Sequence, residues 1–188
     1  MPVKAPEKPK SLTWTQVKKH IQDFSQASLL DLIHQMYNAN DINKVFLTAR
    51  FQPEATLGSK ELADMKKRIH RLMCPNLNRY DADPQIREAR KIITEYKKTK
   101  DTLGTLDLML AYAEAGNEFT CTYGDIDSPF YDSLCSMLDA FAKLFQLSPD
   151  EYRPYFQDRL QALARSASNI GWGYGDYVSD VAKELGVW

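Results

Sequence analysis

Residues 103–115 read Leu-Gly-Thr-Leu-Asp-Leu-Met-Leu-Ala-Tyr-Ala-Glu-Ala, and this stretch decides the fold. Its apolar residues fall on more than one face of a helix with about 3.6 residues per turn. A helix that is apolar all round is buried on all sides, so we expect this one to be the most central helix of the protein. Gly116 follows it, and because glycine is favoured just past a helix C-terminus, we expect the helix to end there.

The sequence on both sides of this stretch also has a helical pattern. Apolar residues recur three and four positions apart, and no run of strict alternation long enough to indicate a strand interrupts them. We therefore predict an all-α protein of about nine helices, arranged as a multi-helix bundle or as a solenoid-like stack of helical hairpins. The residues expected to cap helix starts are Thr13 with Gln16, Ser25, Asn40, Ser59, Asp83 with Pro84, Ser128 with Pro129, and Ser148 with Glu151.

The first three predicted helices each carry an apolar stripe that we expect to face a core. The stripes consist of Trp14, Val17, Ile21 and Phe24, then Leu29, Leu32, Ile33, Met36 and Tyr37, and then Ile42, Val45, Phe46 and Ala49. Residues 11–188 are accordingly predicted to form a single all-helical domain. Residues 1–10, with three prolines and three lysines, are predicted to be a disordered tail.

Charge is separated along the chain, although the formal net charge of the 188 residues is −1. Residues 1–100 carry 19 Lys and Arg against 11 Asp and Glu, a net of +8, whereas residues 101–188 carry 5 against 14, a net of −9. This separation suggests a basic subdomain at residues 11–100 and an acidic one at residues 101–188. It also favours a charged partner or head-to-tail association of two copies.

Composition excludes several classes of protein. A hydrophobic fraction of 44%, a charged fraction of 26% and a mean hydropathy of −0.47 are not those of an integral membrane protein or a disordered chain. Three cysteines, Cys74, Cys121 and Cys135, are too few for a disulfide framework and favour a reducing compartment. Because no segment resembles a signal peptide or a membrane span, we expect a cytoplasmic protein with no membrane partner.

Basic residues cluster on two predicted helices, at residues 59–74 and 84–100. Clustered Lys and Arg attract phosphate backbones without reading sequence, so nucleic acid is an alternative partner. The competing interpretation is that these are ordinary solvated faces, some of which pair with the acidic half of the chain. The candidate nucleic-acid-binding residues are Lys67, Arg71, Arg87, Arg90 and Lys91.

An acidic segment at residues 118–127 reads Glu-Phe-Thr-Cys-Thr-Tyr-Gly-Asp-Ile-Asp. Asp125 and Asp127, with Glu118, suit a divalent metal or a general acid/base pair, so a metal-assisted hydrolase is a second alternative. The competing interpretation is that Asp127 and Ser128 cap the next helix. Because the three histidines lie upstream on separate predicted helices, we assign no metal ligand, catalytic residue or cofactor.

A glycine-aromatic loop at residues 170–175 reads Ile-Gly-Trp-Gly-Tyr-Gly. The spacing of its glycines, and the lack of a preceding predicted strand, exclude a dinucleotide-binding fingerprint. Two interpretations stay open for its aromatic residues, Trp172 and Tyr174. They form a recognition face, or the glycines turn the chain sharply while Trp172 fills the core.

The acidic segment and the glycine-aromatic loop carry a resemblance to a known family. Phe119-Thr120-x-x-Tyr123-Gly124-Asp125-Ile126-Asp127 followed by Phe130-Tyr131, and Ile170-Gly171-Trp172-Gly173, resemble the motifs of a bacterial all-helical family known only as a domain of unknown function. The resemblance covers nearly the whole chain from about residue 11. It implies a shared fold and a shared surface where the two motifs meet, and it transfers no activity.

The chain also departs from that family. Relatives often have Phe-His-Asp after Gly-Trp-Gly, whereas this chain has Tyr174-Gly175-Asp176. Asp132 and Cys135 stand where the family leads us to expect Asn and Glu. If these positions formed an active site, this chain would lack part of it.

The leading interpretation is a cytoplasmic helical protein-interaction module whose partner is another protein or a second copy. Its recognition surface requires residues 123–127 and 171–176 to come within reach of each other's side chains. The candidate recognition residues are Tyr123, Asp125, Asp127, Tyr131, Trp172, Tyr174 and Asp176.

Overall fold

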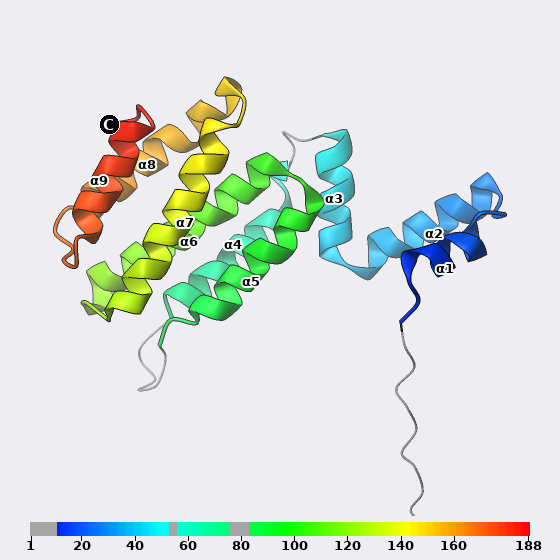
Figure 1. Cartoon of the computed structure of the whole chain (residues 1–188), viewed down its shortest axis with the longest axis horizontal. Coiled ribbons are helices and arrows are strands. Elements are labelled where there is room, and N and C mark those ends of the chain that lie inside the picture. Colours follow the sequence, from blue (N-terminus) through cyan, green and yellow to red (C-terminus); the bar gives the residue numbers. More distant parts are fainter. Residues whose placement is uncertain (1–10, 53–55, 76–82) are drawn as a thin grey trace, which may run out of the picture. The chain divides into compact units, whose positions relative to one another are not determined.

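The computed structural model describes residues 11–52, 56–75 and 83–188, and the tail predicted for residues 1–10 lies outside them. In the described ranges the chain forms nine α-helices and no strand, which confirms the predicted all-α class (Figure 1). The helices are α1 (Trp14–Ile21), α2 (Gln26–Ala39), α3 (Asp41–Phe51), α4 (Lys60–Met73), α5 (Ile86–Tyr96), α6 (Thr102–Tyr123), α7 (Ser128–Gln146), α8 (Arg153–Ala167) and α9 (Tyr174–Glu184). Single 3-10 turns at Lys97–Thr99 (η2) and Asp150–Tyr152 (η3) precede α6 and α8.

The chain divides into two compact units, residues 1–40 and residues 41–188. This division differs from the single domain predicted for residues 11–188, and it does not fall near residue 100, where the charge changes sign. The reason is that α4 and α5, from the basic part, pack against α6, from the acidic part. Helices from the basic part and from the acidic part of the chain therefore share one core.

The second unit is built around α6, as residues 103–115 predict. This helix packs against α4, α5, α7 and α8, and α7 and α8 both pack against α9. Contacts from one helix to four others are typical of a bundle with a central helix, whereas in a solenoid each repeat contacts only its neighbours. Fully buried side chains of α6 include Leu103, Leu106, Leu110 and Tyr112.

The predicted end of the central helix at Gly116 is wrong, because α6 continues to Tyr123. A Cβ at position 116 would lie 2.4 Å from Cδ2 of Leu134 on α7. Glycine is needed here because two helices approach closely, and not because the backbone turns.

Three predicted helix caps are confirmed. Thr13 and Gln16 form a reciprocal capping box at the start of α1. The Ser25 hydroxyl accepts a hydrogen bond from the Ser28 N–H at 3.1 Å, and the Ser59 hydroxyl accepts one from the Leu62 N–H at 3.2 Å. These side chains satisfy backbone donors that a helix start leaves unpaired.

Two predicted caps are wrong. Helix α5 begins at Ile86, and no side-chain capping bond forms at its start, so Asp83 and Pro84 do not open it. The Ser148 hydroxyl donates to the Leu144 carbonyl at 2.7 Å, back toward α7, and α8 begins later, at Arg153. In both cases the residues have the spacing of a helix cap. The helix nevertheless begins at a different residue, because tertiary packing determines its start.

The apolar stripes predicted to face a core in α1 and α2 do not do so. Both helices, which are described in full, bury no residue. Within these stripes Trp14 is 69% exposed, Met36 53% and Ile33 47%, and the most covered residues, Val17, Ile21, Leu29 and Leu32, are only partly buried. Two short helices form too small a body to enclose a core by themselves. In α3, which belongs to the second unit, Val45 is the buried residue.

Among the described helices, none combines the length and the apolar character needed to cross a membrane.

Candidate recognition surface

The segment between α6 and α7 is held by Gly124 and Asp127. Gly124 ends α6 with φ of +94°, a backbone conformation that favours glycine. The Asp127 carboxylate then accepts a hydrogen bond from the Phe130 N–H at 3.0 Å and caps α7. Asp127 thus caps a helix, as the alternative to a catalytic role predicts.

Tyr131 links the two motif segments of the sequence. Its side chain, almost completely buried, comes from α7 and donates a hydrogen bond from its hydroxyl to Oδ1 of Asp125 at 2.6 Å. Its ring stacks on Trp172, with 6.3 Å between centroids and 22° between planes, and lies 5.6 Å from the ring of Tyr174. Residues 123–127 and 171–176 therefore meet through one tyrosine.

The glycine-aromatic loop gives its two aromatic residues different environments. Trp172 adopts φ of +59° and is 62% exposed, whereas Tyr174 is completely buried at the start of α9. A Cβ on Gly175 would lie only 2.5 Å from the carbonyl oxygen of Ala167, so the close approach of α9 to the end of α8 requires glycine. The prediction that Trp172 fills the core is therefore wrong: Tyr174 is the aromatic residue that fills it, and Trp172 is exposed to solvent.

Asp125 and Gly171 are neighbours in space. A Cβ on Gly171 would stand 3.7 Å from Oδ2 of Asp125, the oxygen that Tyr131 does not use. We define the acidic aromatic surface as Asp125, Tyr131, Gly171 and Trp172. The sequence around these residues contains no Lys or Arg at positions 115–142 or 166–182.

Burial and the hydrogen bond to Asp125 raise the pKa of the Tyr131 phenol to about 12. The phenol is therefore neutral across the physiological pH range and acts as a hydrogen-bond donor to the carboxylate. This bond fixes both the side chain of Asp125 and the ring on which Trp172 stacks.

The remaining recognition candidates lie beside the acidic aromatic surface or serve the fold. Tyr123 is 41% exposed and its ring lies 5.1 Å from that of Phe119. Asp176 is exposed in the first turn of α9. Four of the seven predicted residues, Asp125, Tyr131, Trp172 and Tyr174, are thus in mutual contact through Tyr131.

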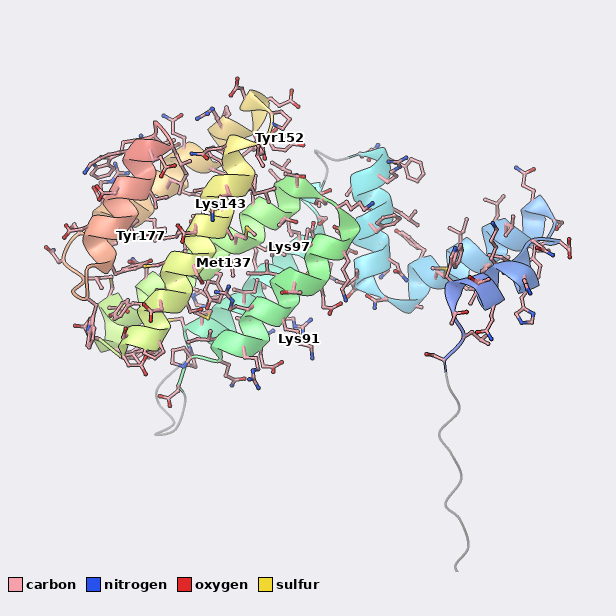
Figure 2. The ribbon with its side chains drawn as sticks, viewed as in Figure 1. Lys91, Lys97, Met137, Lys143, Tyr152 and Tyr177 are labelled. Carbon is pink, nitrogen blue, oxygen red and sulfur yellow. The ribbon has the colours of Figure 1, made fainter. Side chains whose placement is uncertain are left out.

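One of the basic candidates, Arg90, contacts another helix. Arg90 donates from its guanidinium to the carbonyl and hydroxyl of Ser133 and to the hydroxyl of Ser136, all within 3.1 Å, so its assignment to a free basic face is wrong. Spacing places Arg90 beside the apolar stripe of α5, but there it faces α7. Arg87 and Lys91 are exposed on α5, and Figure 2 labels Lys91 there.

Lys67 and Arg71 line a groove of about 1050 Å³ formed by α4, α6 and α8. Acidic side chains share this groove, and its other charged lining residues are Asp64, Lys66, Arg68, Glu114, Glu118 and Arg159. The surface of the groove is therefore of mixed charge.

Asp107, which is 1% exposed, lies on α6 beside this groove. Its carboxylate pairs with Lys66 at 2.8 Å and with Arg159 at 2.5 Å, and Arg159 also pairs with Glu114 at 2.7 Å. Burial alone lowers the pKa of Arg159, but the hydrogen bonds and charges of Glu114 and Asp107 outweigh burial and raise the pKa above its ordinary value. Arg159 therefore keeps its charge and compensates the buried carboxylate.

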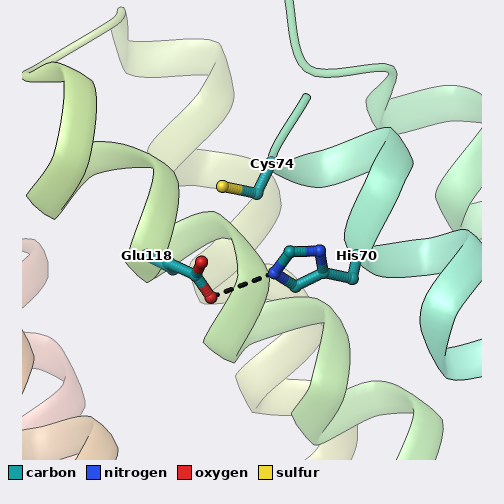
Figure 3. Close-up of side chains that lie close together, drawn as sticks. All are labelled: His70, Cys74 and Glu118. Carbon is teal, nitrogen blue, oxygen red and sulfur yellow. Dashed lines mark hydrogen bonds and ion pairs between the residues drawn. The ribbon is translucent and has the colours of Figure 1, made fainter. Parts of the chain in front are cut away.

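Sequence reasoning missed a group of three side chains on α4 and α6. His70, Cys74 and Glu118 place one ligand atom each within 4.8 Å of the other two, the arrangement in the described residues that could hold a metal ion (Figure 3). Burial and the Glu118 charge raise the pKa of the Cys74 thiol. The sequence signal was a His on α4 and a Cys four residues later, just past the helix end. Glu118 was a metal candidate with Asp125 and Asp127, but nothing in the sequence relates it to His70, which precedes it by 48 residues.

The three carboxylates of the hydrolase alternative, Glu118, Asp125 and Asp127, each contact a different partner. Glu118 lies 3.0 Å from His70, Asp125 accepts from Tyr131, and Asp127 caps α7.

Comparisons of this chain with protein-family models, with curated proteins and with solved structures found no match.

Proposed function

We propose that this chain is a protein-interaction module whose acidic aromatic surface binds a cationic segment of a partner protein. The observation that carries the proposal is the double contact of Tyr131, with Asp125 through a hydrogen bond and with Trp172 through ring stacking. These contacts hold a carboxylate and an exposed indole on one rigid platform.

The conformation of Trp172 supports a binding role. A left-handed backbone costs a residue other than glycine about 1–3 kcal/mol, and such strain is concentrated at functional sites. A tryptophan that is 62% exposed returns little burial energy to offset this cost. A partner that covers the indole supplies that burial, and tryptophan is among the residues that most often anchor an interface.

Charge supports a cationic partner. With no Lys or Arg at positions 115–142 and 166–182, the carboxylates of Asp125, Asp132 and Asp176 have no basic neighbour in sequence. A Lys or Arg side chain over the Trp172 ring gains about 0.5–2 kcal/mol from the cation–π interaction. Oδ2 of Asp125 is placed to accept a hydrogen bond from the same ammonium or guanidinium group.

The experiment is a binding titration of the full chain with an array of short peptides that differ in Lys and Arg content. We expect basic peptides to bind, and Trp172→Ala to weaken binding by at least about tenfold. The matched control is Trp188→Ala, because Trp188 is 53% exposed and lies at the C-terminus. Binding of the Trp172→Ala variant at wild-type strength, or equal binding of peptides without basic residues, contradicts the proposal.

Two variants that each neutralise one carboxylate separate the effect of charge on binding from the effect of packing. Asp125→Asn keeps the size of the side chain and removes its charge, so we expect weaker binding and a smaller dependence on salt. Asp64→Asn is the control, because Asp64 is 52% exposed on α4. An Asp64→Asn variant with the same defect as Asp125→Asn would indicate a general charge effect.

Nucleic-acid binding is the second candidate function, and exposed Lys67, Arg71, Arg87 and Lys91 are the residues that favour it. It predicts that duplex DNA or single-stranded RNA binds at low salt, and that affinity falls steeply as salt is raised. The double variant Lys67→Gln with Arg71→Gln then weakens binding, whereas Trp172→Ala leaves it unchanged. Absence of binding at low salt rejects this alternative.

A further inference from the structure

Helix α4 presents an imidazole and a thiol on the same side, at its C-terminal end. His70 and Cys74 are four residues apart, so their side chains lie about one turn from each other. Cys74 is the C-cap residue just after α4, and its N–H donates to the His70 carbonyl at 2.7 Å, which is the last hydrogen bond of this helix end. Their relative placement is therefore set by backbone hydrogen bonding.

Helix α6 supplies a third donor opposite them. Oε2 of Glu118 lies 3.0 Å from Nε2 of His70, and the donor atoms of all three residues lie within 4.8 Å of one another. Figure 3 shows the imidazole directed at the Glu118 carboxylate, with the Cys74 sulfur beside both. Because α4 and α6 pack against each other in the core of the second unit, rigid helices hold this triangle.

We propose that His70, Cys74 and Glu118 form a binding site for a zinc ion. Zinc binds nitrogen, sulfur and oxygen donors at about 2.0–2.3 Å in tetrahedral geometry, which places the donor atoms about 3.4–3.6 Å apart. A maximum separation of 4.8 Å needs only small side-chain rotations to reach that value. His70 and Glu118 are 48% and 56% exposed, so they are free to make such rotations.

The donor set selects the class of metal. Magnesium and calcium prefer sites made of oxygen atoms, whereas a thiolate with an imidazole favours zinc and similar softer divalent ions. Binding requires the Cys74 thiol to lose its proton, which passes to solvent as the zinc–sulfur bond forms.

The surroundings of the triangle leave room for a fourth ligand. His70 and Glu118 both line the groove of about 1050 Å³, together with the cations Lys67 and Arg71. A tetrahedral zinc with three protein ligands keeps an open position for water or a small anion, and here that position opens toward the groove. The metal thereby also ties α4 to α6.

The experiment titrates the metal-free full chain, without an affinity tag, first with Co²⁺ and then with competing Zn²⁺. We expect one equivalent of Co²⁺ to bind with a thiolate-to-metal charge-transfer band, and Zn²⁺ to displace it. We expect Zn²⁺ to raise the melting temperature of the wild-type chain. Cys74→Ser should abolish the band, and Glu118→Gln should weaken metal binding more than about tenfold.

Matched controls separate this site from other donors in the chain. Cys121→Ser and His34→Ala remove a thiol and an imidazole on α6 and α2, and both variants should bind Co²⁺ as the wild type does. Because Glu118→Gln changes an exposed side chain, its circular dichroism spectrum should match the wild type, which distinguishes loss of a ligand from loss of fold. No stoichiometric binding by the wild type, or an unchanged band in Cys74→Ser, overturns the proposal.

Discussion

Residues 11–40 and residues 41–188 are both built from amphipathic helices with well-formed caps, yet only the second unit has a core. Ser25 and Ser59 cap α2 and α4 with the same hydrogen bond. The stripe of α4 then buries Leu62, Met65, Ile69 and Met73 against other helices, whereas α2 buries nothing. A local serine cap sets the start of each of these two helices, but burial needs further elements that close around the apolar face.

This difference predicts an uneven distribution of stability. In the second unit, the free energy of unfolding comes from side chains packed around α6. In the first unit, caps and partial burial are what hold α1 and α2, so these helices should open at a lower free-energy cost.

Truncating a core side chain should give the largest effect. Phe141→Ala removes a fully buried ring on α7 that contacts Phe145 and Phe156, and should lower the free energy of unfolding by about 3–5 kcal/mol. Leu30→Ala, at an exposed position of α2, should change it by less than about 0.5 kcal/mol. Urea unfolding followed by circular dichroism measures both, and equal losses would contradict the contrast.

Breaking the buried ion cluster should give the next effect. Arg159→Ala leaves Asp107 with Lys66 as its remaining cation, so we expect a loss of about 1–3 kcal/mol in the free energy of unfolding. Lys183→Ala, which breaks an exposed pair with Asp180, is the control and should cost less than about 0.5 kcal/mol. The same urea titration compares them, and an Arg159→Ala variant as stable as wild type would rule out this role for the pair.

Removing matched serine caps should affect the two units differently. Ser59→Ala should lower the global free energy of unfolding by about 0.5–2 kcal/mol, because α4 is part of the core. Ser25→Ala should leave the global value unchanged and should speed hydrogen exchange only in α2. Hydrogen-exchange mass spectrometry, combined with urea unfolding, distinguishes these outcomes. A global loss in Ser25→Ala would show that the first unit unfolds together with the second.

The Tyr131 hydrogen bond should have a small effect that depends on pH. At neutral pH, Tyr131→Phe should cost about 0.5–1.5 kcal/mol of unfolding free energy. The pKa of Tyr131 is about 12 in the folded chain and about 10 for an unfolded tyrosine, so its contribution is complete below pH 10 and is lost between pH 10 and 12. The stability difference between wild type and variant should therefore shrink over that range.

Tyr37→Phe, on α2, is the control for removal of a tyrosine hydroxyl. Tyr37 is 38% exposed and belongs to the unit without a core, so its variant should have the wild-type stability at neutral pH. Urea unfolding at a series of pH values measures both variants. A difference for Tyr131→Phe that stays constant up to pH 12 would argue against the hydrogen bond to Asp125.

The fold could be predicted to the level of helix positions and the identity of the central helix. Apolar residues on more than one face of residues 103–115 were sufficient for that, because they need burial against several other helices. The end of the same helix could not be predicted, because Gly116 is set by its contact with Leu134 on α7. The lack of a core in α1 and α2 could not be predicted either, since an amphipathic stripe does not indicate whether another element covers it.

The sequence indicated the two motifs of the candidate site, but it did not indicate which residue joins them into one surface. The link between them, Tyr131, belongs to a third segment, and no periodicity relates it to Trp172. Arg90 was misassigned because spacing separates apolar from polar sides of a helix but does not show which polar side faces another helix. His70 and Cys74 were visible as a pair, whereas Glu118 joined them only through packing of α4 on α6.

The most direct test of the central claim is backbone NMR of the full chain during titration with a lysine-rich peptide. The acidic aromatic surface predicts that amides of residues 123–131 and 170–176 shift together, with one dissociation constant, and that α4 and α5 stay unchanged. Shifts in only one of the two segments, or shifts confined to other parts of the chain, would contradict a single recognition surface built on Tyr131.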